Sequence, residues 1–312
     1  MQGGALMLLI EEIRDRKECI DLLIITHVDD DHIGGILKWF EQDGEGAKDL
    51  VKKVWFNSGK LILEHSQEKT HEDYEDNLLI SLHNGRYDTS IKQGVTFEDF
   101  IDEHKIWDRR LIKQGDVIEL FGLQFTILSP SSDKLAKLLG KWEKEAPVTE
   151  TAYISDYSIS LSDLINEPDS FKEDNSVPNG SSIAFIVENE HTKIMFLGDA
   201  HPQPIIDSLI AMGYSAQNPI KVDYVKLSHH GSKANTNYDL LHLIHADKFL
   251  ISSDSSVHGL PDKQCLARII NCKKDVNLYF NYPELAPRIF SEQDYVEFPN
   301  FNVCDADENI TI

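Results

Sequence analysis

The stretch that most constrains the fold is residues 21–35, where chemistry-bearing side chains directly follow an apolar run. Residues 22–25 read Leu-Leu-Ile-Ile, an apolar β-type run, and they are followed by two histidines and three aspartates at positions 27–32 and by Gly34 and Gly35. Such a run is typical of a short buried strand. Because α/β folds place ligands and catalytic groups where strands end, this pattern predicts an α/β protein with its functional site here.

The residue types at 27–32 point to a divalent metal. Neutral imidazole and carboxylate are the ligands preferred by Zn, Mn and Fe. If the segment stays extended, alternation directs His27, Asp29 and Asp31 to one side, and His32 can turn toward a second metal. So much negative charge in one loop costs several kcal/mol without a cation. The alternative is an acidic helix N-terminus, but the two histidines and two glycines favour a metal site.

Two later motifs repeat this arrangement of an apolar strand followed by ligands. Residues 193–197 form an apolar run that ends in Gly198 and Asp199, although Gly-Asp alone is a common turn. Within residues 223–232, a second apolar run leads into His229 and His230. Adjacent residues of a strand face opposite sides, so one histidine can bind metal while the other binds substrate or supports the loop. The choice between them stays open, and His229 is favoured as the metal ligand.

Two weaker features lie near these motifs. Asn179 and Ser182 precede the strand expected at 183–187, where a plain polar turn explains them equally well. His258 lies in a serine-rich stretch, and an ordinary surface loop explains it equally well. The other histidines are scattered, with no motif around them.

Taken together, the motifs His27-x-Asp-x-Asp-His32, Gly198-Asp199 and His229-His-Gly-Ser232 resemble the metallo-β-lactamase superfamily. Asp29, which stands where the general pattern has a second histidine, is similar to the ComEC-like branch, named after the hydrolase domain of a DNA-uptake channel protein. The resemblance implies a four-layer αββα sandwich with two divalent metal ions, Zn or Mn with Fe possible, at one edge of its two sheets.

The resemblance also implies roles for individual residues. One metal would be held by His27 and Asp29, the other by Asp31, His32 and His229, and Asp199 would bridge them. The metals would lower the pKa of a shared water so that hydroxide attacks a phosphoryl or acyl centre. Asp31 could also steer this nucleophile. The groups assigned to oxyanion stabilisation are His230, His258 and Lys233, and those assigned to substrate contact or loop support are Asn179, Ser182 and Ser232.

The coarse organisation predicted is one domain over 1–312, with an insertion at about 60–110 that could cover the site and a mobile loop at about 131–175. Helices are expected at 4–19, 36–42, 204–212, 238–245 and 264–270, strands at 22–25, 51–56, 183–187, 193–197, 224–227 and 248–251, and a hairpin at 117–128. Relatives begin with a β-hairpin ahead of the first helix, which appears truncated here. Three explanations are open: either the sheet is built in another way, or a partner or a second copy supplies an edge strand, or the natural start lies upstream.

Composition narrows the substrate and the location. The formal net charge of −23, from 30 basic and 53 acidic residues, argues against a general electrostatic grip on nucleic acid. Small anionic or phosphodiester substrates fit better, and nucleic acid fits only with a local basic patch or a basic partner. No apolar run approaches the roughly 20 residues that span a bilayer. There is no signal-peptide pattern, and the four cysteines are scattered, so a cytoplasmic location is expected.

The function predicted from these observations is metal-dependent hydrolysis, as a binuclear phosphodiesterase or nuclease. Fold alone cannot select the substrate, because members of the superfamily also hydrolyse lactams, lactones and thioesters. The alternative from another class is a partner-dependent or non-catalytic metal-binding subunit of a larger assembly, for example a defence or regulatory system.

Overall fold

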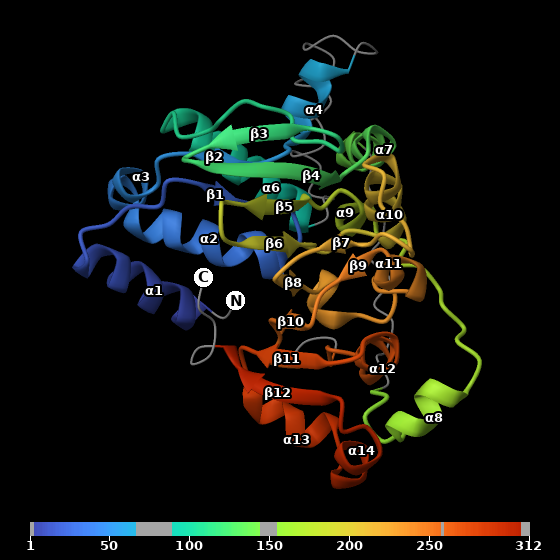
Figure 1. The fold of residues 1–312 in the computed structure, drawn as a ribbon. Helices are drawn as coiled ribbons and strands as arrows, with labels where there is room; N and C mark the ends of the chain where they lie inside the picture. The colour runs from blue at the N-terminus through green and yellow to red at the C-terminus, as the bar shows by residue number, and fades with distance from the viewer. Residues whose placement is uncertain (1–2, 67–88, 144–154, 257–258, 307–312) are drawn as a thin grey trace. The chain divides into compact units, whose positions relative to one another are not determined.

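The computed structural model describes residues 3–66, 89–143, 155–256 and 259–306 (Figure 1). The chain divides into two compact units. Unit 1 comprises residues 1–113 and 131–149, and unit 2 comprises residues 114–130 and 150–312. His258 and parts of the expected insertion and of the expected mobile loop lie outside the described residues.

Unit 1 is mainly helical and is built around one short pair of parallel strands. Its elements are α1 (Gly3–Asp15), β1 (Leu23–Ile24), α2 (Asp30–Asp43), α3 (Glu45–Leu50), β2 (Val54–Trp55), α4 (Gly59–His65), α6 (Thr89–Glu103) and α7 (Ser132–Glu143). β1 pairs with β2 in parallel. Phe40 of α2 and Phe56 after β2 both pack against Phe97 of α6. The described end of the expected insertion, α6, therefore contributes to the core of unit 1.

Unit 2 is built on a mixed sheet of eight strands. These are β3 (Val117–Leu120), β4 (Leu123–Ser129), β5 (Ala184–Glu188), β6 (Lys193–Phe196), β8 (Tyr224–Lys226), β10 (Lys248–Ile251), β11 (Val276–Phe280) and β12 (Phe301–Asp305), in the spatial order β12-β11-β10-β8-β6-β5-β4-β3. The five strands from β6 to β12 run parallel, and β3, β4 and β5 add antiparallel neighbours. A separate parallel pair is formed by β7 (Ile220–Lys221) and β9 (Ile244–His245).

Helices of unit 2 bury one face of this sheet. The helical elements are α8 (Leu161–Asn166), α9 (Val177–Gly180), α10 (Pro202–Ala211), η1 (Ser228–Gly231), α11 (Tyr238–His242), α12 (Lys263–Cys272), η2 (Pro283–Leu285), α13 (Ala286–Ile289) and α14 (Glu292–Glu297). The core joins inward residues of the central strands to apolar faces of α10 and α12, as Val225 and Phe249 cluster with Leu209 and Leu266. This packing fixes the strand ends that carry the second and third motifs.

The α/β class expected from the sequence is confirmed, and several elements differ from the expectation in their extent. The predicted hairpin is present as β3 and β4. The helix expected over 238–245 ends at His242, and the last two residues of that range form strand β9. The structure also contains β11 and β12, which the sequence did not reveal. Among the described helices, none is both long and apolar enough to cross a membrane.

The start of α2 corrects the expected geometry of the first motif. The helix was expected from residue 36, but it begins at Asp30, with Asp29 as its N-cap in an extended conformation. Asp31 therefore lies on a helical turn and does not continue the alternation of His27 and Asp29. The physical reason is that carboxylates in a first turn are stabilised by the positive end of the helix dipole. The acidic helix start set aside from the sequence is the local structure observed.

Candidate metal centre

In unit 1, the short connection from β1 to α2 brings four of the predicted ligands together. His27 Nε2 lies 3.6 Å from Asp29 Oδ2, and His32 Nε2 lies 3.7 Å from Asp31 Oδ2. The two imidazole rings have centroids 4.2 Å apart. His27 is buried, whereas Asp31 is half exposed. Imidazole and carboxylate thus form two adjacent pairs at the N-terminus of α2.

Thr26 orients both imidazoles of this cluster. Its hydroxyl lies 3.1 Å from His27 Nδ1 and 3.3 Å from His32 Nδ1. A hydroxyl has one proton to donate and lone pairs to accept, so it can satisfy both ring nitrogens. If both rings donate from Nδ1 to the Thr26 oxygen, Nε2 is the nitrogen that each histidine would present to a cation. No pattern in the sequence marks Thr26 for this role.

In unit 2, the remaining predicted ligands lie at the carboxyl end of adjacent parallel strands. β6 leads into Asp199, β8 leads into His229 and His230, and the loop after β10 begins at Ser252. The Asp199 carboxylate is almost completely buried, and its backbone N–H donates to Ser182 Oγ at 2.9 Å. The carboxyl edge of a parallel sheet is the usual location of a ligand site in α/β proteins.

The sequence pattern predicted that the two histidines of unit 2 alternate along a strand. In the structure they lie beyond the strand and do not alternate. β8 ends at Lys226, and both residues lie in the short turn η1 with positive φ, 45° at His229 and 55° at His230. Left-handed conformations in residues other than glycine cost about 1–3 kcal/mol each and are often found at functional sites. The turn sends the two rings to different partners, with centroids 6.1 Å apart.

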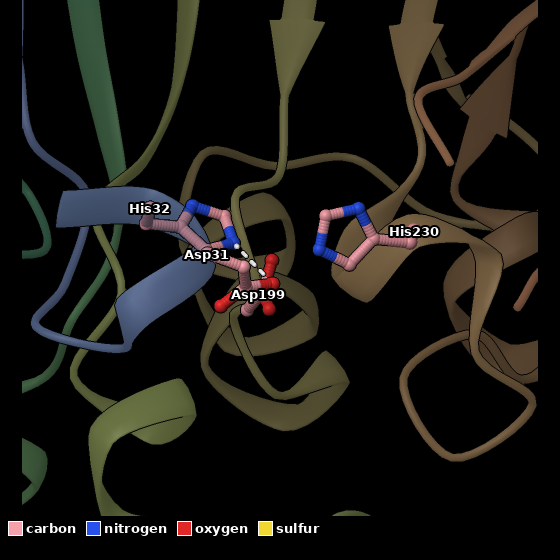
Figure 2. Close-up of side chains that lie close together, drawn as sticks. All are labelled: Asp31, His32, Asp199 and His230. Atoms are coloured by element: carbon pink, nitrogen blue, oxygen red, sulfur yellow. Dashed lines mark ion pairs between the residues drawn. The ribbon is translucent and has the colours of Figure 1, made fainter. Parts of the chain in front are cut away.

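His230 also presents a ligand atom close to Asp199. Its Nδ1 lies 2.6 Å from the backbone oxygen of Ser252, which can only accept, so Nδ1 carries the proton. The ligand atoms of His230 and Asp199 lie within 4.8 Å of each other, as do those of Asp31 and His32 in unit 1. Figure 2 shows these four side chains, with Asp31 and His32 on the first turn of α2.

His229 is held in a polar network. Its Nδ1 lies 3.0 Å from Asn235 Oδ1 and 3.5 Å from Asp174 Oδ2, and its Nε2 lies 3.9 Å from Asp199 Oδ2. Burial alone lowers the pKa of His229, but the hydrogen bond to Asp174 and the charge of Asp199 raise it more, to about 9. Burial raises the pKa of Asp174, but hydrogen bonds from His229, the Ser176 N–H and Asn179 hold it well below its usual range.

The other predicted site residues have clear structural positions. Asn179 is buried and donates to Asp174 Oδ2 at 2.7 Å, and Ser232 is buried in the turn after η1. Lys233 is half exposed, with Nζ 3.1 Å from Asp262 Oδ1 and 3.8 Å from Asp156 Oδ2. Lys233 therefore already has carboxylate partners.

Three residues near the unit 2 motifs were missed or set aside at the sequence level. They are Asp174, Asn235 and His201. His201 is buried, with Nε2 3.8 Å from Asp174 Oδ2. Its position two residues after Asp199 was the one available signal. Asp174 and Asn235 had none, because single polar residues in loops are common.

Each unit presents a carboxylate and an imidazole whose ligand atoms lie close together, Asp31 with His32 in unit 1 and Asp199 with His230 in unit 2. Mixed imidazole and carboxylate ligands suit Zn or Mn. No protein-family model matches the chain, and the search of curated proteins found no match either.

Proposed function

We propose that the chain is a metal-dependent hydrolase whose metal ligands include Asp31 and His32 in unit 1 and Asp199 and His230 in unit 2. The observation that carries the proposal is that each unit presents one carboxylate and one imidazole with ligand atoms within 4.8 Å. Asp31 and His32 follow β1, Asp199 follows β6, and His230 follows β8.

The proposal includes a second divalent ion. His27 and Asp29 form a further imidazole–carboxylate pair beside His32. His229 extends the set in unit 2, because its Nε2 faces the carboxylate of Asp199. Two bound dications supply a hydroxide nucleophile at neutral pH and stabilise the charge that develops on an attacked phosphoryl centre. Thr26, Ser182 and the backbone oxygen of Ser252 would orient the ligands.

A phosphodiester is the substrate class that we propose, in line with the sequence resemblance. The formal net charge of −23 favours a small substrate over a long nucleic acid, because the backbone of nucleic acid is repelled by an acidic surface. A bound divalent ion offsets this repulsion locally.

The test combines metal content with hydrolysis of bis-p-nitrophenyl phosphate. The protein, purified without chelator, is assayed with Zn and with Mn, as wild type, Asp199→Asn and Asp31→Asn. We expect bound metal in the wild type and a loss of turnover of more than about 100-fold in both variants, because each loses a charged ligand.

Asp30→Asn provides the matched control. Asp30 is exposed, lies next to Asp31 in the first turn of α2 and accepts a hydrogen bond from Gln93. The substitution changes the net charge by the same amount, and turnover should be retained. Absence of metal from the wild type would overturn the proposal. Bound metal without hydrolysis of any phosphodiester would favour the non-catalytic, partner-dependent alternative.

A further inference from the structure

We infer that Asp174 and Asn235 are positioning residues that fix the neutral ring of His229 as the Nδ1–H tautomer, with Nε2 toward Asp199. Asp174 lies between α8 and α9, far from His229 in sequence, and Asn235 lies in the loop that follows η1. Neither belongs to a motif seen in the sequence. The tautomer follows from unit 2 alone, whereas its use in metal binding rests on the proposed function.

The orientation of the Asn235 amide is the first step. Its Nδ2 donates to Asp174 Oδ2 and to the backbone oxygen of Asp199, both at 3.2 Å. Both partners can only accept, so the nitrogen must face them. The amide oxygen is thereby directed to His229, where Oδ1 lies 3.0 Å from Nδ1. The rotamer of Asn235 is therefore set by the network, which removes the usual ambiguity between amide oxygen and nitrogen.

The neighbours of His229 Nδ1 give the second step. Two are acceptors, Asn235 Oδ1 at 3.0 Å and Asp174 Oδ2 at 3.5 Å. The third is Asn179 Nδ2 at 3.4 Å, which donates to Asp174 at 2.7 Å. The shortest contact and the charged contact both require a proton on Nδ1. A ring that carries its proton there has its lone pair on Nε2, the nitrogen that lies 3.9 Å from Asp199 Oδ2.

The anchoring of Asp174 gives the third step. Its backbone N–H donates to the oxygen of Ala234 at 3.1 Å, and its Oδ1 accepts from the Ser176 N–H at 2.8 Å. The carboxylate is thus tied to the same loop as Asn235 and to the start of α9. A carboxylate that holds the far nitrogen of a ligand histidine fixes the ring and increases its basicity, and its loss typically lowers metal affinity 10–100-fold.

The direct test is long-range ¹H–¹⁵N NMR of the imidazole nitrogens, with the His229 signals identified by their absence in His229→Gln. In metal-free wild type, at a pH above the pKa of this ring, we expect the Nδ1–H pattern. Asp174→Asn should reduce the population of this tautomer and weaken Zn binding, measured by competition with a chromogenic chelator, by about 10–100-fold.

Asp169→Asn is the matched control. Asp169 lies in the same segment and pairs with Arg268 through both carboxylate oxygens. The substitution Asp169→Asn removes a carboxylate and an ion pair, and it should leave the His229 tautomer and the Zn affinity unchanged. An Nε2–H pattern in the wild type would overturn the inference, as would an Asp174→Asn variant with unaltered tautomer. The spectrum decides this even if the protein hydrolyses no phosphodiester, so the two proposals can fail separately.

Discussion

Glu98 is a buried carboxyl group whose ionisation should weaken the fold. It lies on α6 and is 5% exposed. Burial raises its pKa to about 7, against the opposing effects of the Ser58 hydroxyl, the Lys60 charge and the Lys60 N–H. Because the folded state holds this proton more tightly than the unfolded state, its contribution to stability is fully present below the unfolded pKa of 4.5 and is lost as the pH rises to about 7.

Replacement by glutamine should remove this pH dependence. Relative to Glu98→Gln, the wild type should lose about 3 kcal/mol of unfolding free energy between pH 4.5 and pH 8, as measured by chemical denaturation. Glu103→Gln, at an exposed position on the same helix, should follow the wild-type profile. Parallel pH profiles for wild type and Glu98→Gln would show that Glu98 does not bind its proton more tightly in the folded state.

Gly231 is the position where the turn of the two histidines least tolerates a side chain. Its φ is +88°, and a Cβ there would lie 2.7 Å from Cβ of Pro261. Gly213 has the same φ, with nothing within 4 Å of the corresponding Cβ. Gly213→Ala should cost about 1–2 kcal/mol of unfolding free energy from the backbone alone. Gly231→Ala should cost about 1–3 kcal/mol more, from the steric clash. Equal thermal shifts for the two variants would contradict the clash.

Individual candidate ligands were easier to find in the sequence than the residues that contact them. His27, Asp31, Asp199 and His230 each follow an apolar strand, and that pattern is visible in one sequence. Their partners act through tertiary contacts. Ser182 accepts from the Asp199 backbone N–H across 17 positions, and Asp174 reaches Asn235 across 61 positions. No local pattern marks such a pair, since either residue by itself is a normal loop residue.

Secondary structure elements were predicted well where apolar periodicity was strong. Strands β6, β8 and β10 and helix α12 lie where expected. The start of α2 was missed because its first turn is polar, and the dipole stabilises aspartates there. β12 was missed because Phe301–Asp305 alternates little, and its strand character comes from pairing with β11. Pairing between distant segments cannot be derived from local propensity.

Helix α12 also depends on a tertiary contact at its N-terminus. Its N-cap, Asp262, makes no capping hydrogen bond with its own side chain. Instead, Asp156 accepts from the N–H groups of Lys263 at 2.8 Å and Gln264 at 3.1 Å. Asp156→Ala should therefore lower the unfolding free energy by about 2 kcal/mol, at the upper end for a cap because the group is buried.

A helix capped by its own N-cap side chain, α8, provides the comparison for α12. Ser160 accepts from the N–H of Asp163 at the exposed start of α8, and Ser160→Ala should cost about 1 kcal/mol. Thermal or chemical denaturation of the two variants decides the order. If Asp156→Ala were no more destabilising than Ser160→Ala, the distant carboxylate would not be the main cap of α12.

At the scale of the whole molecule, the proposed metal binding should be coupled to the acidity of the chain. The chain carries 53 acidic and 30 basic residues, and this imbalance destabilises a compact state through self-repulsion. Dications bound at the proposed ligands would reduce the imbalance, and they would do so only in the folded chain, because folding brings the ligands of each pair together. Metal binding should therefore raise the free energy of unfolding.

The expected size of this effect follows from mass action. Free metal at 100 times its dissociation constant stabilises the folded state by about 2.7 kcal/mol, which scanning calorimetry would register as a rise in Tm over chelated protein. Added NaCl at equal ionic strength should not reproduce it, because screening is not ligation. Asp31→Asn in unit 1 and Asp199→Asn in unit 2 should each abolish most of the rise, whereas Asp30→Asn should keep it. If either ligand variant retained the full rise, the residue replaced would not hold the metal, and its place in the proposed ligand set would be wrong.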